Sequence, residues 1–227
     1  AVIRSFASPV PTSAGPDIGL ATSGSTLLVG GGNSSPIYEL NPDTGSVIRT
    51  LGGSGRNVSG LAFRNNEIFI RTDDNNTVTV LDYTTGATVR TFAISSTSES
   101  LAAGSDYLYA SNGSTVYVIN PATGATISTR SLGVGTIEGL GVIGNELYVS
   151  VVSSLYVFDR TTYGLLRTFT GMGDLEAVGA DSGSSGAGDF YRLSLTAGAA
   201  FQASTSTPSD GPGEFGNGLD PKLTLYD

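Results

Sequence analysis

Apolar residues come in short bursts that are separated by Gly, Ser, Thr and Asn and that repeat in a fixed order. Three further bursts follow each of the first four copies of an opening dipeptide, and they alternate apolar and polar positions as half-buried strands do. Four strands in about forty residues is the spacing of a β-propeller blade, so the pattern predicts an all-β propeller. The opening dipeptide recurs at intervals of 38 to 41 residues, at Gly19-Leu20, Gly60-Leu61, Ser100-Leu101, Gly139-Leu140 and Ala177-Val178.

The link between the third and fourth strands carries a turn signal. Residues 41–45 (NPDTG) and 120–124 (NPATG) put Pro at the second position of a type I turn and Gly at the left-handed position after it. This geometry predicts a hairpin with a bulge. The turns end at Gly45, Gly86, Gly124 and Gly164.

The two ends of the chain resemble parts of one blade. Residues 1–6 (AVIRSF) match the fourth strand of the repeat, and residues 222–227 (KLTLYD) match a third strand. We therefore expect about five four-stranded blades, the last completed by the N-terminal strand from the same chain or from a neighbouring subunit. The expected divisions are an orphan outer strand (1–8), four repeats (9–176) and an atypical fifth blade (177–227). The strand would contribute Val2, Ile3 and Phe6 to the contact.

The amino-acid composition excludes several classes of catalytic site, metal site and binding partner. The chain has no His, Cys or Trp, which excludes a Ser-His-Asp triad, a Cys nucleophile, thiolate or imidazole zinc sites, iron–sulfur clusters and His- or Cys-ligated haem. A net charge of −9 argues against nucleic acid and anionic membrane surfaces as partners. No apolar run approaches the roughly 20 residues of a membrane span. We expect no enzyme and no catalytic residue, and a carboxylate-based glycosidase or lyase ranks last.

Three carboxylates stand directly before the opening dipeptide, at Glu99, Glu138 and Glu176. The first strand of a blade is innermost, so these side chains are expected to converge at one mouth of the channel. An all-oxygen site of this kind would favour Ca²⁺. The alternative is a solvated acidic rim, and no other cofactor is expected.

Two further sets of polar residues recur. Arg4, Arg49, Arg90 and Arg167 share one position of the fourth strand, where charge protects an outer edge from pairing with another sheet. Four N-x-[ST] sequons are candidate glycosylation sites. Their asparagines are Asn33, Asn57, Asn75 and Asn112.

Two segments resemble known families. Residues 18–176, best at 108–120 (LYASNGSTVYVIN), resemble the YVTN/PQQ-like secreted propeller repeats, which implies an architecture but no activity. The missing Trp argues against WD40 repeats and against binding of the quinone cofactor. Residues 188–227, opening with DFYRLSLTAG at 189–198, resemble part of a bacterial pre-peptidase C-terminal (PPC) domain. This resemblance implies an appendage of secreted proteins and carries no catalytic residues.

Two functions remain open. The first is a non-catalytic extracellular or cell-surface protein that acts in structural assembly, filament formation or adhesion by binding copies of itself through terminal strands. The alternative is a recognition or accessory module of a larger secreted hydrolase or peptidase, which would bind extracellular carbohydrate or protein. The acidic, Lys-poor composition and the small residue Ala1, which fits signal-peptide cleavage, favour secretion.

Overall fold

The computed structural model describes residues 7–10, 19–31, 36–52, 57–72, 76–95 and 100–171. The chain divides into two units, Ala1–Gly188 and Asp189–Asp227, and every described residue belongs to the first. Sixteen β-strands and no helix occur in these ranges. Accordingly, this part of the chain contains no helix of the length and apolarity that a membrane crossing requires.

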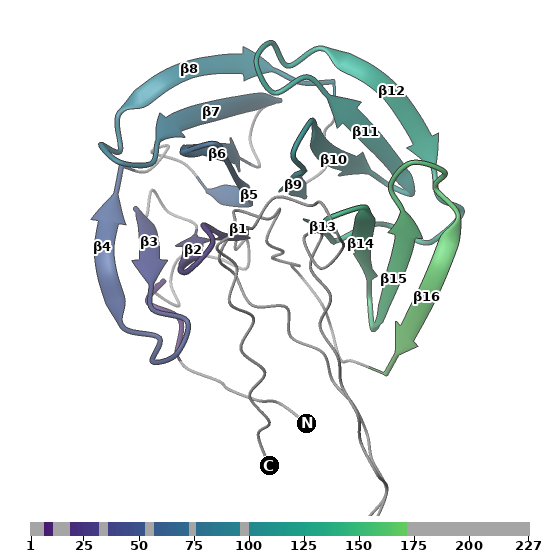
Figure 1. The fold of residues 1–227 in the computed structure, drawn as a ribbon, viewed down its shortest axis with the longest axis horizontal. Coiled ribbons are helices and arrows are strands. Elements are labelled where there is room, and N and C mark those ends of the chain that lie inside the picture. The colour runs from purple at the N-terminus through teal and green to yellow at the C-terminus, as the bar shows by residue number, and fades with distance from the viewer. Residues whose placement is uncertain are drawn as a thin grey trace, which may run out of the picture. The chain divides into compact units, whose positions relative to one another are not determined.

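The strands form four antiparallel sheets, each a simple meander of four consecutive strands. Each sheet is one propeller blade, and the blades follow one another around a common centre (Figure 1). Blade 1 contains β1 (Gly19–Thr22), β2 (Leu27–Gly30), β3 (Ile37–Leu40) and β4 (Val47–Leu51). Blade 2 contains β5 (Val58–Arg64), β6 (Glu67–Thr72), β7 (Thr77–Asp82) and β8 (Thr88–Ala93). Blade 3 contains β9 (Leu101–Ala103), β10 (Leu108–Asn112), β11 (Thr115–Ile119) and β12 (Thr126–Ser131). Blade 4 contains β13 (Gly139–Ile143), β14 (Glu146–Val151), β15 (Ser154–Asp159) and β16 (Leu165–Thr170).

The predicted hairpin between the third and fourth strands is confirmed. In all four blades the register shifts by one residue at the same place, as a bulge requires. Gly45, Gly86 and Gly124 adopt the left-handed conformation, with φ of 70°, 71° and 77°. In blade 4, however, Tyr163 rather than Gly164 takes this position, with φ of 58°, because the turn there closes one residue before the glycine.

The hydrophobic core lies between neighbouring blades rather than inside one sheet. Alternate side chains of a strand point to opposite faces, so blades 2 and 3 each pack one face on the preceding blade and the other on the following blade. The 1/2 seam contains Leu28 and Ile68, the 2/3 seam Phe69 and Leu108, and the 3/4 seam Tyr109. A fourth, smaller cluster covers the other face of blade 1.

The structure confirms an all-β propeller with four four-stranded blades. The expected fifth blade (177–227) lies outside the described residues, and of the strand expected to complete it (1–8) only residues 7 and 8 are described. In Figure 1, the part of the ring between blade 4 and blade 1 holds no described strand.

Candidate interaction surface

Outer-strand arginines join blades 1 and 2 to the blade that follows. Arg49 on β4 forms an ion pair with Glu39 on β3. Its other nitrogens donate to the main-chain oxygens of Tyr83 and Thr84, at 2.9 and 3.1 Å, in the β7–β8 turn of blade 2. Arg90 on β8 repeats this arrangement, since it pairs with Glu67 in its own blade and donates to the Pro121 oxygen of blade 3 at 3.1 Å.

An apolar residue two positions further on completes each contact. Leu51 and Phe92 occupy the same register position, and each packs on the left-handed glycine of the next blade. The Leu51 side chain lies 3.4 Å from where a Cβ on Gly86 would stand, and the Phe92 ring lies 2.4 Å from the same point at Gly124. Only glycine leaves room for Phe92 there, so these turns are receptors for the preceding outer strand.

The 3/4 seam uses different residues for the same contact. Arg130 takes the position of Phe92 and lies over the Tyr163 ring, 5.4 Å from its centre. A second arginine, Arg160, reaches back from blade 4 to Asp106 of blade 3 with an N–O distance of 2.8 Å. The outer strand of blade 3 therefore also meets the turn of the following blade.

Glu39 is the most buried carboxylate of these seams, with 3% of its surface exposed. The equivalent positions in the other blades are Val80, Val118 and Val157. Burial opposes ionisation of Glu39, but hydrogen bonds from Tyr83, Arg49 and Thr26 outweigh it and hold its pKa below the usual value. Glu39 is therefore a charged acceptor that ties blade 1 to blade 2.

Blade 4 has the same outer-strand residues without the following contact. Arg167 pairs with Glu146 in its own blade, and this hydrogen bond lowers the pKa of Glu146. Within the described ranges Arg167 has no partner in another blade. Phe169, the counterpart of Phe92, is 45% exposed, whereas Leu51 is 6% exposed. We call Arg167 and Phe169, with the exposed Leu166 beside them, the blade 4 end surface.

The predicted Ca²⁺ ligands are only partly described. The Glu138 carboxylate accepts a hydrogen bond of 2.8 Å from the Val152 main chain, where it caps the β14–β15 turn. Glu99 and Glu176 lie outside the described residues. No group of three or more His, Cys, Asp or Glu side chains that could hold a metal occurs in the described part. The Ca²⁺ site stays a prediction.

The structure also describes only some of the other residues that the sequence singled out. Asn112 is exposed at the end of β10, and Asn57 is half-buried directly before β5. The other candidates lie outside the described ranges, and they are Asn33, Asn75, Val2, Ile3 and Phe6.

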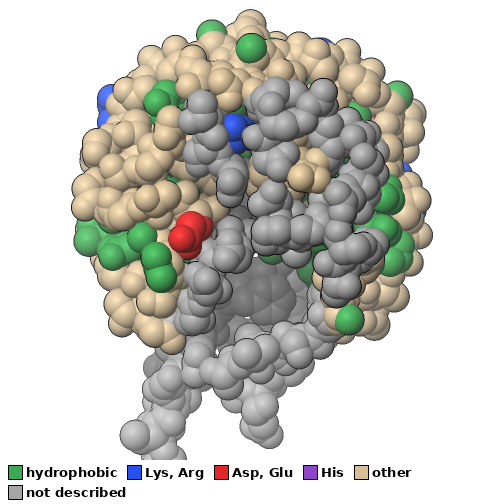
Figure 2. Space-filling model, turned by 180° about the vertical axis from the view of Figure 1, so that it is seen from behind, with side chains coloured by type: hydrophobic (Ala, Val, Ile, Leu, Met, Phe, Trp, Pro, Cys, Tyr) green, Lys and Arg blue, Asp and Glu red, His purple; other side chains and the backbone are tan. Residues whose placement is uncertain are grey.

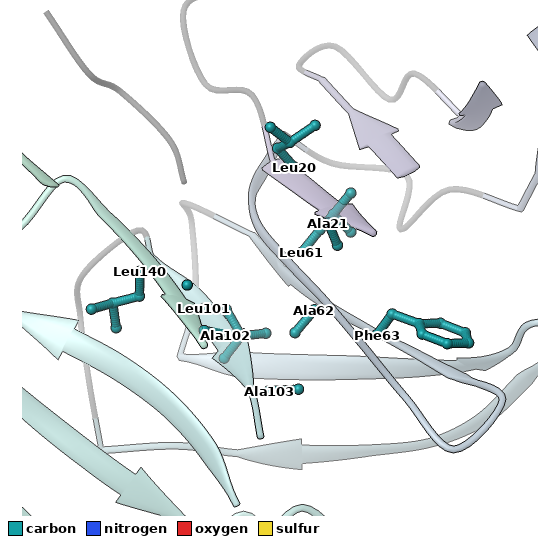
Figure 3. A pocket seen from close by; sticks show the side chains of 10 residues that line it. Leu20, Ala21, Leu61, Ala62, Phe63, Leu101, Ala102, Ala103 and Leu140 are labelled. Atoms are coloured by element: carbon teal, nitrogen blue, oxygen red, sulfur yellow. The ribbon is translucent and has the colours of Figure 1, made fainter. Parts of the chain in front are cut away.

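The side chains around the centre of the four described blades are apolar. A small pocket there is bounded by the innermost strands β1, β5, β9 and β13 (Figure 3). Leu20, Leu61, Leu101 and Leu140 line it, one from each blade, with Ala21, Ala62, Phe63, Ala102, Ala103 and Gly141. No titratable side chain lines this pocket, so its described lining supplies no side chain for general acid–base chemistry.

The sequence pattern identified the arginines but not their contacts with the following blade. Their expected role in protecting an outer edge stays a prediction, and the structure adds that Arg49 and Arg90 donate to main-chain oxygens of the next blade. Their acidic partners were not singled out, because Glu39 comes from a third strand and Glu67 from a second strand. A search for one acidic residue per arginine-bearing repeat would have found them.

The four blades and their seams define a β-propeller module. The chain belongs to the PQQ_2 family, described as outer membrane protein assembly factor BamB, whose profile matches residues 5–139. The match is consistent with the YVTN/PQQ-like resemblance, whereas no support exists for the PPC-like segment. No curated protein matches the sequence significantly.

Solved structures share the fold at low sequence identity. The Neurospora crassa Pan2 WD40 domain is 16% identical with a TM-score of 0.54, over 75% of this chain and 56% of that one. A mitotic checkpoint complex chain is 14% identical with a TM-score of 0.51, over 74% and 57%. Myxococcus xanthus glutaminyl cyclase is 19% identical with a TM-score of 0.50, over 58% and 66%. This chain therefore spans less than two thirds of each, and the likeness concerns the fold alone.

Proposed function

We propose that this chain is a non-catalytic β-propeller module of the cell surface or extracellular space that acts by protein–protein assembly. The observation that carries the proposal is the blade 4 end surface. Arg167 and Phe169 have the chemistry that binds a following blade, yet Phe169 is 45% exposed and Arg167 contacts only its own blade among the described residues. In this proposal the partner is a blade-like element of another copy of the chain.

The distribution of exposed apolar side chains supports this assignment. Figure 2 shows them in separate groups near the rim of one face. Of the large exposed apolar residues on the outer strands, β16 contributes the most. They are Val47 and Ile48 on β4, Val89 on β8, Ile127 on β12, and Leu165, Leu166 and Phe169 on β16.

The family adds support of a different kind. Its description names an assembly factor of outer membrane proteins, which supports a role in assembly. In this proposal the fifth blade, formed by residues 177–227 with the strand 1–6, comes from a neighbouring copy and covers the blade 4 end surface. The PPC-like sequence would belong to that blade.

The proposal is tested by light scattering of the native chain over a range of concentrations. We expect particles larger than one chain, and we expect Phe169→Glu to reduce their size while the melting temperature stays the same. Ile127→Glu is the matched control, because Ile127 is 51% exposed on β12 and lies away from the blade 4 end surface.

A native chain that stays monomeric at every concentration would overturn the assembly function and favour the recognition module. Assemblies that tolerate Phe169→Glu as well as Ile127→Glu would show that the contact lies elsewhere.

A further inference from the structure

We infer that the turn between β10 and β11 is a self-modification site, where Asn112 loses its side-chain amide and becomes aspartate or isoaspartate. The reaction needs only water and a mild base, and it differs from the N-glycosylation that the sequence predicts at the same asparagine. It takes place whether or not the chain assembles with other copies, so it is independent of the proposed function.

The chemistry follows from the glycine after the asparagine. Hydroxide removes the proton of the Gly113 main-chain nitrogen, which attacks the side-chain carbonyl carbon (Cγ) of Asn112 and closes a five-membered succinimide ring. The bond from Cγ to the side-chain nitrogen breaks, and this nitrogen leaves as ammonia with a proton from water, which restores the hydroxide. Water then adds to either ring carbonyl group, and the ring opens to aspartate or isoaspartate. Glycine favours the attack because it has no Cβ beside the attacking nitrogen.

The turn leaves the reacting groups accessible. Asn112 is exposed at the end of β10, and Gly113 follows with φ of 56° as the first residue of the two-residue turn to Thr115. A Cβ on Gly113 would meet no atom within 4 Å, so the turn is open around this residue. Among the described residues, the Gly113 N–H donates no hydrogen bond. The attacking nitrogen therefore gives up no contact when it reacts.

Exposed asparagines in other hairpin turns provide a comparison. Asn66 and Asn145 are exposed in the two-residue turns β5–β6 and β13–β14, but a glutamate follows each of them. No other described asparagine precedes a glycine. The second Asn-Gly pair of the chain, at 217–218, lies outside the described residues. Exposure and turn position are thus shared by three asparagines, and the following glycine distinguishes Asn112.

The same turn holds the connection between blade 3 and blade 4. The main-chain oxygens of Gly113 and Ser114 accept hydrogen bonds from the main chain of Ile137, at 2.9 Å, and of Leu132, at 3.0 Å. Ile137 is 3% exposed and packs in the 3/4 seam. Isoaspartate continues the chain through its side-chain carbonyl group, which adds a carbon to the backbone directly before these two oxygens. Its formation therefore displaces them and weakens the 3/4 seam.

Peptide mapping by mass spectrometry tests the assignment on the unglycosylated, folded chain after incubation in mildly alkaline buffer. We expect the peptide with position 112 to gain the mass difference between an amide and an acid, and to become a substrate for isoaspartyl methyltransferase. Peptides with Asn66 and Asn145 are internal controls and should keep their amides over the same period. A chain incubated in urea gives the rate at position 112 without the fold.

Two results of the mapping would overturn the inference. One is an intact Asn112 in the folded chain while the chain in urea is modified, because the fold would then block the attack. The other is equal modification at Asn66 and Asn145, because exposure rather than the glycine would then decide the rate.

Thermal melts test the consequence for the seam. The incubated native chain should melt roughly 2–4 °C below a fresh sample, which is the effect of one lost hydrogen bond in a chain of this size. Asn112→Gln is the matched control, because its longer side chain closes only a less favourable six-membered ring, and its melting temperature should stay the same on incubation. An equal fall in Asn112→Gln would contradict the role of this turn in the seam.

Discussion

The outer strands of blade 2 and blade 4 contain nearly the same residues in different surroundings. β8 carries TVRTF and β16 carries LLRTF, and in both the arginine pairs with a glutamate at the start of the second strand. Phe92 packs on Gly124 of blade 3, whereas Phe169 is 45% exposed. Among the described residues, nearly the same strand sequence thus lies in a seam in blade 2 and at a surface in blade 4.

The 1/2 and 3/4 seams add a second contrast. Blade 1 meets blade 2 through the buried charge of Glu39, while blade 3 has Val118 at that position and Ser128 opposite it. A buried ion pair is weak evidence for stability in itself, but the loss of one partner is severe. The charged seam should therefore be the most sensitive to single substitutions.

The largest effect is expected from Glu39→Ala. It leaves Arg49 and Tyr83 without their acceptor in the seam, and we expect a loss of about 3 kcal/mol in the free energy of unfolding and a fall of roughly 6–12 °C in melting temperature. The double variant Glu39→Val with Arg49→Ser copies the residues of blade 3 and should lose less. Urea unfolding measures both, and a double variant that is no more stable than Glu39→Ala would contradict this account.

The variants Phe92→Ala and Phe169→Ala compare the contribution to stability of the 2/3 seam with that of the blade 4 end surface. Removal of the Phe92 ring from Gly124 should reduce the free energy of unfolding by about 2–3 kcal/mol, whereas the exposed Phe169 should contribute about 0.5 kcal/mol or less. Thermal melts of the two variants under identical conditions give the comparison. Equal losses would mean that Phe169 is covered by another part of the protein in solution.

Substitution of the arginines should also destabilise the protein more in blade 2 than in blade 4, but by smaller amounts than substitution of the phenylalanines. Arg90→Ala removes the ion pair with Glu67 and the hydrogen bond to Pro121 of the next blade, and we expect a loss of about 1 kcal/mol. Arg167→Ala removes a solvent-screened pair within one blade and should change stability by about 0.5 kcal/mol or less. If chemical denaturation finds Arg167→Ala the more damaging variant, the role assigned to the next-blade contact is wrong.

The smallest expected effect is a difference in how the free energy of unfolding depends on pH. The folded-state pKa values of Glu39 and Glu146 lie below their unfolded value of 4.5, so both stabilise the fold above that pH, and this contribution disappears as the pH falls through the folded-state values. Glu39→Gln should therefore flatten the loss of stability below pH 4.5 in urea titrations. Glu146→Gln should flatten it less, because the Glu146 pair is more exposed. Parallel acid profiles for the native chain and Glu39→Gln would rule out this role of Glu39.

The sequence alone determined the blades. Alternation of apolar and polar residues fixes which face of a strand is buried, and the repeat of about forty residues fixes four strands to a blade. The turns could also be predicted, because glycine at 45, 86 and 124 ends a turn where the chain needs a left-handed residue. Blade 4 shows the limit of this reasoning, since Tyr163 adopts the left-handed conformation with a usable glycine next to it.

The tertiary structure decided what each repeated position does. Glu39 and Val80 are equivalent in the repeat, yet only the packing of blade 1 on blade 2 brings Tyr83 to the carboxylate. Likewise, the repeat predicts an arginine on the outer strand. It does not predict whether a main-chain oxygen of the next blade accepts a hydrogen bond from that arginine. Local sequence patterns determine the geometry of one blade. Contacts between blades join residues that are far apart in the sequence, so they depend on how successive sheets are arranged around the centre.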